Sequence, residues 1–274
     1  MAFGAPRYLR QAENLALSLR LHMPDVPIAI VTDVRGPLLL FNETISLDRS
    51  WGLGLVQKLF IDKYSPFCNT LFIDSDSIVT RPFSSELEQI RKHSFAPICT
   101  DYYTEYDDQF IDLKRTLQFL GISRFPRFNG GVYYFTRDET SRKVFRCARD
   151  ILTQWQSLGI KPLLDSSGPN EEVIFGLAME MAGAAAYDDH GRLMRTPLGI
   201  RGRLKIEPLG GGTRFQKGNE LVEPAICHFT GWWTARAEYI RCERLLRGER
   251  VGFVMVWFFY KKFVRTKVLG GPRS

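Results

Sequence analysis

The chain has 274 residues, which is enough for one large domain or at most two. Apolar residues make up 45% and charged residues 24%, a composition typical of a folded, water-soluble protein, so a disordered chain is excluded. Lys and Arg number 37 against 30 Asp and Glu, and the net charge of +7 is compatible with nucleic acid, anionic lipid or phosphorylated ligands without selecting among them.

Cysteine usage and the absence of a targeting pattern predict a cytoplasmic protein. The five cysteines are odd in number and none is spaced C-x-x-C, so neither a disulfide framework nor a zinc site is expected. No apolar run reaches the ~18–20 residues of a membrane-spanning helix. Residues 1–7 lack the charged and then apolar order of a secretory signal.

The first third of the chain predicts alternating helices and strands. Apolar spacing predicts helices over residues 8–22 and 53–64, and buried runs predict strands over 27–33 and 70–73. This alternation is typical of a parallel, doubly wound sheet, which binds ligands at the carboxyl ends of its strands. Asp33 and residues 74–76 fall at those ends. Only residues 1–4 remain for a strand before the first helix.

The remaining elements predict a single domain with a C-terminal tail. Strands are expected over residues 95–99, 128–135 (as a pair) and 224–229, helices over 138–157, from 169–172 onward and over 234–247, and a polar, aromatic loop over 101–108. We therefore expect an α/β domain over residues 1–247, with a mixed, mostly parallel sheet flanked by helices. A basic, aromatic tail is expected over 248–274.

The strongest chemical signal is the predicted strand over 70–73 followed by Asp74-Ser75-Asp76. Two carboxylates one residue apart can converge on one hard cation if the strand breaks its alternation there. Such an ion would bridge the phosphates of a nucleotide and neutralise charge on a departing diphosphate. The alternative is a strand that becomes polar where it reaches the surface.

Two further segments offer polar groups near predicted strands. In Asn129-Gly130-Gly131 the glycines allow backbone to approach a ligand closely, and Asn129 offers a donor and an acceptor. A plain hairpin or bulge is the alternative. His228 could complete a metal site with the two carboxylates, since neutral imidazole is a common metal ligand. Taken alone, it also fits a buried, hydrogen-bonded histidine.

Together these segments resemble family 8 glycosyltransferases, which have the GT-A fold and transfer sugars from nucleotide-sugar donors. The correspondence runs in order from about Phe3 to Arg236. It includes the metal-binding D-x-D at 74–76, the sugar-site turn at 128–132, an N-D-Q-like helix start at 170–172 and the start of an H-x-x-G motif at 228–231. The resemblance implies a Rossmann-like GT-A domain and metal-dependent, retaining transfer, most simply from a UDP-sugar to a glycan or lipid-linked acceptor.

The same resemblance implies roles for individual residues. Asp74, Asp76 and His228 would bind Mn²⁺ or Mg²⁺. The donor would be bound by Ala2, Phe3 and Asp33 at the nucleoside, by Asn129, Gly130 and Gly131 at the sugar, and also by Lys58, Ser75, Gly231 and Arg236. Glu171 and Glu172 would face the transferred sugar or the acceptor, with Glu171 the candidate nucleophile.

Three departures from the family pattern bear on these roles. Thr234 stands where the family carries a lysine that contacts the diphosphate, and Arg236 could substitute because guanidinium binds phosphate bidentately. The pair Glu171-Glu172 replaces an Asp–Gln pair and so leaves the donor sugar open. The short segment before the first helix leaves the nucleoside contacts open.

Two other functions remain open at this stage. In a haloacid-dehalogenase-type phosphatase, Asp74 would be the nucleophile and Asp76 the acid–base. A non-catalytic membrane-surface protein could use the apolar run 251–260 and the basic run 261–267, which suit an anionic bilayer, and a transferase could also lie at the inner membrane face. Nucleic acid is not expected as a partner because the basic residues are scattered.

Residues 210–212, three glycines, are expected to form a turn rather than a triphosphate-binding loop.

Overall fold

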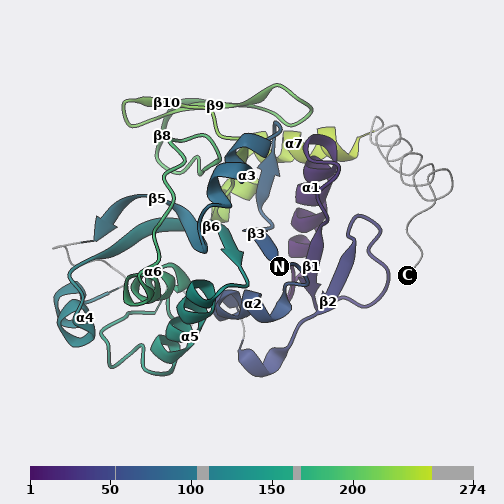
Figure 1. Cartoon of the computed structure of the whole chain (residues 1–274). Coiled ribbons are helices and arrows are strands. Elements are labelled where there is room, and N and C mark those ends of the chain that lie inside the picture. The colour runs from purple at the N-terminus through teal and green to yellow at the C-terminus, as the bar shows by residue number, and fades with distance from the viewer. Residues whose placement is uncertain (53, 104–110, 163–167, 249–274) are drawn as a thin grey trace.

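The computed structural model describes residues 1–52, 54–103, 111–162 and 168–248 (Figure 1). Its α-helices are α1 (Pro6–His22), α2 (Ile61–Tyr64), α3 (Ser84–Ile90), α4 (Leu113–Leu120), α5 (Glu139–Thr153), α6 (Glu171–Ala182) and α7 (Ala237–Arg247). Its strands are β1 (Ala29–Thr32), β2 (Glu43–Ser46), β3 (Asn69–Ile73), β4 (Ser77–Val79), β5 (Phe95–Tyr103), β6 (Phe125–Thr136), β7 (Met194–Arg195), β8 (Ile200–Glu207), β9 (Gly212–Lys217), β10 (Glu220–Val222) and β11 (Ile226–His228). The mixed α/β class expected from the sequence is confirmed.

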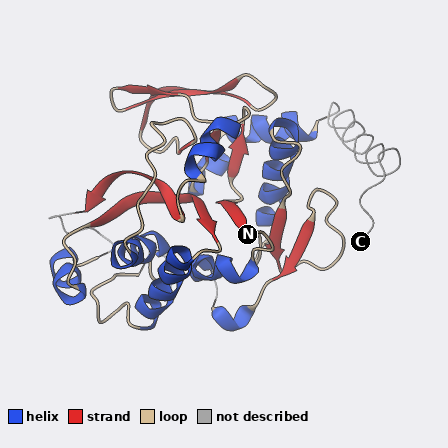
Figure 2. Ribbon diagram, viewed as in Figure 1, coloured by secondary structure: helices blue, strands red, loops and turns tan. Residues whose placement is uncertain are grey.

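The sheet of β3, β6 and β5 lies at the centre of the fold, between helices (Figure 2). Residues of β6 alternate between two cores. Tyr133 and Phe135 pack with side chains of α5 and α6, whereas Val132 and Tyr134 pack with side chains of α1 and α3. Because both faces of β6 are buried, its sequence is a nearly continuous apolar run rather than an alternating one.

Two expectations about this sheet are wrong. Residues 125–136 form one strand rather than a pair, because Gly130 and Gly131 have no positive φ and continue the strand. The described strands are also not mostly parallel: β6 runs antiparallel to β3 and β5, and β11 antiparallel to β4, while β1–β2 and β7–β11 are parallel pairs. An apolar run predicts burial on both faces, but strand direction depends on the connection between strands, which the run does not encode.

Most predicted elements are present with shifted ends. The helix expected over 53–64 is a 3₁₀ stretch, Gly54–Phe60, followed by α2, and the helix expected over 234–247 begins at Ala237 after a 3₁₀ turn, Gly231–Ala235. The strand expected over 95–99 extends to Tyr103 as β5, so the expected loop begins later. The turn between β8 and β9 includes Gly210 and Gly211, and β9 begins at Gly212, with positive φ at Gly210 and Gly212.

Parts of three predictions lie outside the described residues. These are residue 53 of the helix expected over 53–64, the loop residues 104–108, and the tail from residue 249 onward, including the apolar run 251–260 and the basic run 261–267. Among the helices that the structure describes, none combines the length and apolar character needed to cross a bilayer.

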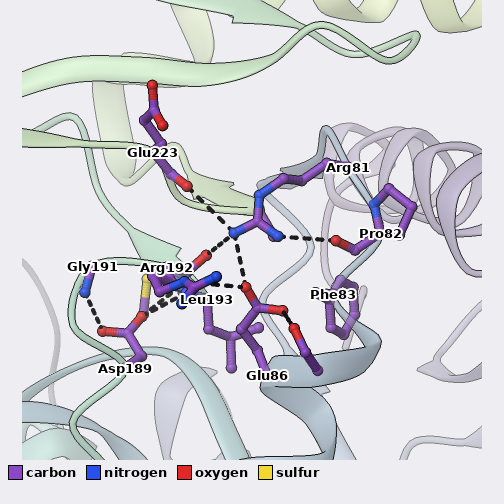
Figure 3. Close-up of polar contacts among 12 residues, drawn as sticks. Arg81, Pro82, Phe83, Glu86, Asp189, Gly191, Arg192, Leu193 and Glu223 are labelled. Carbon is purple, nitrogen blue, oxygen red and sulfur yellow. Dashed lines mark hydrogen bonds and ion pairs between the residues drawn. The ribbon is translucent and has the colours of Figure 1, made fainter.

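A polar network links the residue after β4 to the segments that precede β7 and β11 (Figure 3). The guanidinium of Arg81, just after β4, donates to the Glu86 carboxylate at 2.9 Å and to the Arg192 carbonyl at 2.8 Å. Asp189, which is 2% exposed, accepts from the amides of Gly191, Leu193 and Met194 and from Arg195. These bonds satisfy buried amides ahead of and within β7, and β7 pairs with β11, so the network fixes the strand that ends at His228.

Candidate functional site

The first part of the site is a turn between β3, which is partly buried, and β4, which is buried. β3 ends at Ile73 and β4 begins at Ser77, and the amide of Ser77 donates to the Asp74 carbonyl at 3.1 Å. Asp74 and Asp76 therefore lie outside both strands. In an extended strand two such residues share a face about 7 Å apart, whereas this turn brings both carboxylates close to His228.

Strand pairing brings His228 beside this turn. β11 runs antiparallel to β4 with His228 opposite Ser77, and the amide of Phe229 donates to the Asp76 carbonyl at 3.0 Å. The Nε2 atom of His228 lies 3.1 Å from Asp76 Oδ1 and 3.7 Å from Asp74 Oδ2. Residues about 150 positions apart in the chain are thus adjacent because two short strands pair.

Asp74, Asp76 and His228 form a donor set that suits a divalent cation. One ligand atom from each lies within 4.8 Å of the others. Carboxylate oxygens and an imidazole nitrogen suit Mn²⁺, and carboxylate oxygens suit Mg²⁺. The residues present therefore fit the metal ion that the sequence motifs imply.

The tautomer of His228 follows from its second contact. Asn129 Oδ1 accepts from the amide of Gly131 at 3.1 Å, which identifies that atom as the oxygen, and it lies 2.6 Å from His228 Nδ1. The Nδ1 atom of His228 must therefore carry the proton in this contact, and Nε2 faces the two carboxylates. An outer hydrogen bond of this kind orients metal-binding histidines.

Lys58 lies at the centre of the anionic groups. Its Nζ atom donates to Asp74 Oδ2 at 2.7 Å, to Glu171 Oε1 at 2.9 Å and to the Gly130 carbonyl at 3.3 Å. The Lys58 side chain is 9% exposed and that of Glu171 is 4% exposed. Removing either Lys58 or Glu171 would leave an uncompensated buried charge, which is strongly destabilising. The two side chains are therefore held in this hydrogen-bonded arrangement.

Glu171 and Glu172 open α6, where negative charge is favoured by the helix dipole. The side chain of Asn170 caps the helix by accepting from the amide of Glu172 at 2.8 Å. Glu172 Oε1 accepts from the amide of Gly130 at 2.6 Å, so the two glutamates contact β6 and Lys58 from the same helix end.

Gly130 and Gly131 are needed for close packing rather than for a turn. A Cβ atom on Gly131 would lie 2.2 Å from His228 Nδ1, and one on Gly130 would lie 2.6 Å from the Tyr133 hydroxyl. Both distances are too short for real contacts. The two glycines therefore let His228 and the glutamates approach the backbone of β6.

The charges of the site shift its pKa values in consistent directions. Burial disfavours the charged form of Asp74, but Lys58 and His228 outweigh burial and hold the pKa of the Asp74 carboxyl below its ordinary value. Burial likewise disfavours a charged His228, but Asp76 and then Asp74 raise the pKa of the ring. Burial, and then repulsion from Glu171, raise the pKa of Glu172 from 4.5 to about 7. Without a metal ion, the site thus holds a cationic lysine and a glutamate that titrates near neutrality.

The expected nucleoside residues lie at the end of β1. Ala2 forms a parallel bridge with Thr32, and its amide donates to the Val31 carbonyl at 2.9 Å, so Ala2 and Phe3 follow the edge of β1. Asp33 Oδ2 accepts from the amide of Gly4 at 3.1 Å and from Arg49 at 3.0 Å. The structure brings Asp33 next to residues 2–4, and the contact of Ala2, Phe3 and Asp33 with a nucleoside stays a prediction.

Three expected donor residues have other surroundings. Ser75 lies in the turn between Asp74 and Asp76, and Gly231 begins the 3₁₀ turn after β11 with a φ of 55°. The guanidinium of Arg236 lies 4.3 Å from the centre of the Trp232 ring, within cation–π range. Arg236 is therefore held against an exposed tryptophan, and its contact with a diphosphate stays a prediction.

The structure places two further residues at the site, Tyr133 and Arg49, which the sequence does not predict there. The Tyr133 hydroxyl is buried without a hydrogen-bond partner among the described residues, and burial, followed by the charges of Glu171, Glu172 and Asp74, raises its pKa well above the usual value. Arg49 binds Asp33 from a segment without chemical motifs. Tyr133 stands in the 128–135 run, but its apolar neighbours indicate only a core residue.

The fold is similar to those of solved sugar transferases. No protein-family profile matches the sequence, and no curated protein matches it. The structure of galactosyltransferase LgtC in complex with donor and acceptor sugar analogs is similar with a TM-score of 0.52 at 15% identity, covering 88% of this chain and 94% of LgtC. An active-site mutant of LgtC is similar with a TM-score of 0.50 at 16% identity, covering 84% and 86%. The chain therefore has the GT-A glycosyltransferase fold that its motifs predict.

Proposed function

We propose that the protein is a divalent-metal-dependent glycosyltransferase that moves a sugar from a nucleotide-diphosphate donor to a glycan or lipid-linked acceptor. The convergence of Asp74, Asp76 and His228 beside Lys58 carries the proposal. In support of it, side chains that suit a divalent cation and a fixed positive charge lie at the ends of the strands β3 and β11, and the fold is similar to that of LgtC, which was solved in complex with donor and acceptor sugar analogs. A UDP-sugar is the donor that the sequence motifs favour.

In this proposal each charged group has a distinct task. The metal ion would neutralise charge on the two phosphates of the departing nucleotide. Lys58 stays protonated, because burial is outweighed by Asp74 and Glu171, which raise its pKa, and its ammonium stabilises negative charge at the same place. Asn129 fixes the ring of His228, and Asp33 holds the nucleoside end together with residues 2–4.

The two glutamates are proposed to act on the sugar side of the site. Glu171, the candidate nucleophile for a retaining reaction, has one oxygen engaged by Lys58, so attack requires its second oxygen to reach the sugar. Glu172 exchanges a proton near pH 7 and is suited to contact the acceptor hydroxyl. The stereochemistry of the product, followed by NMR, separates retention from inversion.

A phosphatase based on Asp74 and Asp76 is not favoured by this site. In that reaction Asp74 must be free to attack phosphorus, whereas here it is bound by Lys58 and lies beside His228. The D-S-D turn also follows β3 rather than β1, the first of the described strands in chain order.

The proposal is tested by a panel of nucleotides and nucleotide sugars with and without Mn²⁺. We expect UDP or a UDP-sugar to raise Tm only when Mn²⁺ is present, and slow hydrolysis of one UDP-sugar. The Asp76→Asn variant should lose both effects while keeping its metal-free Tm. Turnover of p-nitrophenyl phosphate without any response to nucleotides would contradict the proposal in favour of the phosphatase.

The proposed location is cytoplasmic, with attachment to the inner membrane face through the tail. The tail combines the apolar run 251–260 with the basic run 261–267, which suits the surface of an anionic bilayer. A lipid-linked acceptor would then lie within reach of an enzyme held at the same surface.

A further inference from the structure

The strands β8, β9 and β10 form an antiparallel sheet at the outer edge of the described part of the molecule (Figure 1). One face of this sheet is buried, because Leu204, Ile206 and Phe215 pack in a core with side chains of α7. The residues that alternate with these three lie on the other face and are exposed to solvent. The sheet therefore has an inner apolar face and an outer exposed face.

The outer face of this sheet is strongly basic. Arg201, Arg203 and Lys205 are exposed on β8, and Arg214 of β9 lies directly opposite Lys205. Among the described residues, Arg201, Arg203 and Lys205 have no ion-pair partner, whereas Arg214 pairs with Glu223. Three of the four cations on this face are therefore uncompensated within the chain.

This clustering of charge disfavours the free protein. Lys205 and Arg214 are directly opposite in an antiparallel pair, where like charges are destabilising. Arg203 lies about 7 Å from Lys205 along the strand, which is less than the Debye length of about 8 Å at physiological ionic strength, so salt does not screen their repulsion fully. Glu207 is the acidic residue on this face of β8, and it is paired with Arg241. An anionic partner would relieve the repulsion.

Exposed apolar side chains accompany these charges. Leu221 of β10 is 62% exposed and lies in one row across the sheet with Gln216 and Arg201. Trp232 is 55% exposed and lines a small pocket together with Arg203. Cations beside leucine and tryptophan suit the boundary of an anionic bilayer, where lipid phosphates meet acyl chains. The phosphates of a nucleic acid would match the cations but would leave Leu221 without an apolar partner.

We propose that the outer face of this sheet, called the basic face below, docks the folded domain on an anionic lipid bilayer. The basic face consists of Arg201, Arg203, Lys205, Arg214 and Leu221. The C-terminal tail does not match it as an occupant, because the run 261–267 is also basic. The face and the tail would instead be two separate signals, and stable membrane attachment requires two. The inference rests on the membrane location proposed above, but not on sugar transfer.

Docking through the basic face would bring the metal site close to the lipid surface. Trp232, which shares its pocket with Arg203, follows His228 by four residues. Four residues span at most about 14 Å. A lipid-linked acceptor in the same bilayer would therefore lie near the ion held by His228 and the two aspartates.

Sedimentation of the full chain with lipid vesicles tests the basic face. The test variant carries Arg203→Gln and Lys205→Gln. The matched control carries Lys143→Gln and Arg146→Gln, which remove the same two charges from exposed positions of α5, on the opposite side of the molecule in Figure 1. Each basic residue near an anionic surface contributes about fivefold in affinity. With equal parts of phosphatidylglycerol and phosphatidylcholine, we expect the test variant to bind at least about tenfold more weakly than the wild type.

The control variant should bind these vesicles within about twofold of the wild type, because its charges lie beyond the screening length from the bilayer. The test variant should keep at least the wild-type Tm, since it loses like-charge repulsion. Equal binding of the test variant and the wild type would overturn the basic face and leave the membrane location intact. No binding of the wild type to anionic vesicles would overturn both, whereas hydrolysis of a UDP-sugar in solution would still report sugar transfer.

Two further outcomes would also overturn the proposal. The first is equally strong binding of the wild type to vesicles of phosphatidylcholine alone, because the cations would then have no role. The second is a test variant that binds vesicles like the wild type but loses binding to a DNA duplex, which would assign the face to nucleic acid.

Discussion

Glu172 provides a quantitative test of the electrostatics of the site. Burial and the neighbouring Glu171 raise the pKa of Glu172 from 4.5 to about 7 in the folded protein. Between pH 4.5 and about pH 7, the Glu172 carboxyl has lost its proton in the unfolded chain but keeps it in the folded protein. The folded state therefore binds more protons, and the free energy of unfolding falls as pH rises through this range. The Glu172→Gln variant does not lose free energy of unfolding in this way, and its side-chain oxygen still accepts from the Gly130 amide. It should therefore be more stable than the wild type above pH 7.

The size of the effect follows from the displacement of the pKa. At about 1.4 kcal/mol per pH unit, the rise from 4.5 to about 7 corresponds to at most about 3–4 kcal/mol. Glu172 is half-buried, so solvent screening reduces the expected effect to about 1–3 kcal/mol. Urea unfolding in EDTA at pH 5 and pH 8 measures it. The stability gained by Glu172→Gln should be larger at pH 8, whereas the exposed Glu88→Gln control should give the same difference at both pH values. An equal gain for Glu172→Gln at pH 5 and pH 8 would refute the reasoning.

Three further predictions concern packing, the polar network and the tail. Gly131→Ala should lower Mn²⁺ affinity at least about tenfold by displacing His228, because the new Cβ would lie 2.2 Å from Nδ1, while Gly168→Ala, whose Cβ would lie 3.4 Å from its neighbour, should not. Equal affinities in an electron paramagnetic resonance titration would contradict this. Asp189→Ala should cost about 3–5 kcal/mol in urea unfolding because it leaves three buried amides and Arg195 without their acceptor, and a cost below about 1 kcal/mol would contradict that role. Deleting residues 251–274 should move the protein from the membrane fraction to the soluble fraction, and unchanged partitioning would count against the tail as an anchor.

The parts of the site that are local in sequence could be predicted. Asp74 and Asp76 follow an apolar run that predicts a strand, so the sequence alone places them at the end of β3. His228 could be named from its motif. Its contact with Asp76 depends on the pairing of β4 with β11, two three-residue strands too short for their partners to be read from sequence.

Contacts between distant residues could not be predicted. Lys58 and Glu171 are separated by 113 positions, and the sequence assigned them to the donor and to the sugar, whereas their contact with each other depends on α6 packing beside β6. Similarly, Gly130 and Gly131 suggested a turn, because glycine allows many backbone shapes. In the structure, both glycines lie where a Cβ atom would collide with a neighbouring side chain, His228 for Gly131 and Tyr133 for Gly130.

The direction of the strands shows the same limit. The apolar runs at 70–73 and 128–135 predicted strands correctly. Antiparallel pairing of β3 with β6 follows from the path of the chain through β4, α3, β5 and α4, and β4 and the two helices carry weak patterns in the sequence.

Mn²⁺ binding to the wild type and to Asp76→Asn tests the central claim most directly. Electron paramagnetic resonance of free Mn²⁺ should reveal one site per chain in the wild type. We predict at least about tenfold weaker binding in Asp76→Asn, with unchanged circular dichroism and metal-free Tm, and wild-type binding in the exposed Glu220→Gln control. Wild-type Mn²⁺ affinity in Asp76→Asn would contradict a metal site formed by Asp74, Asp76 and His228.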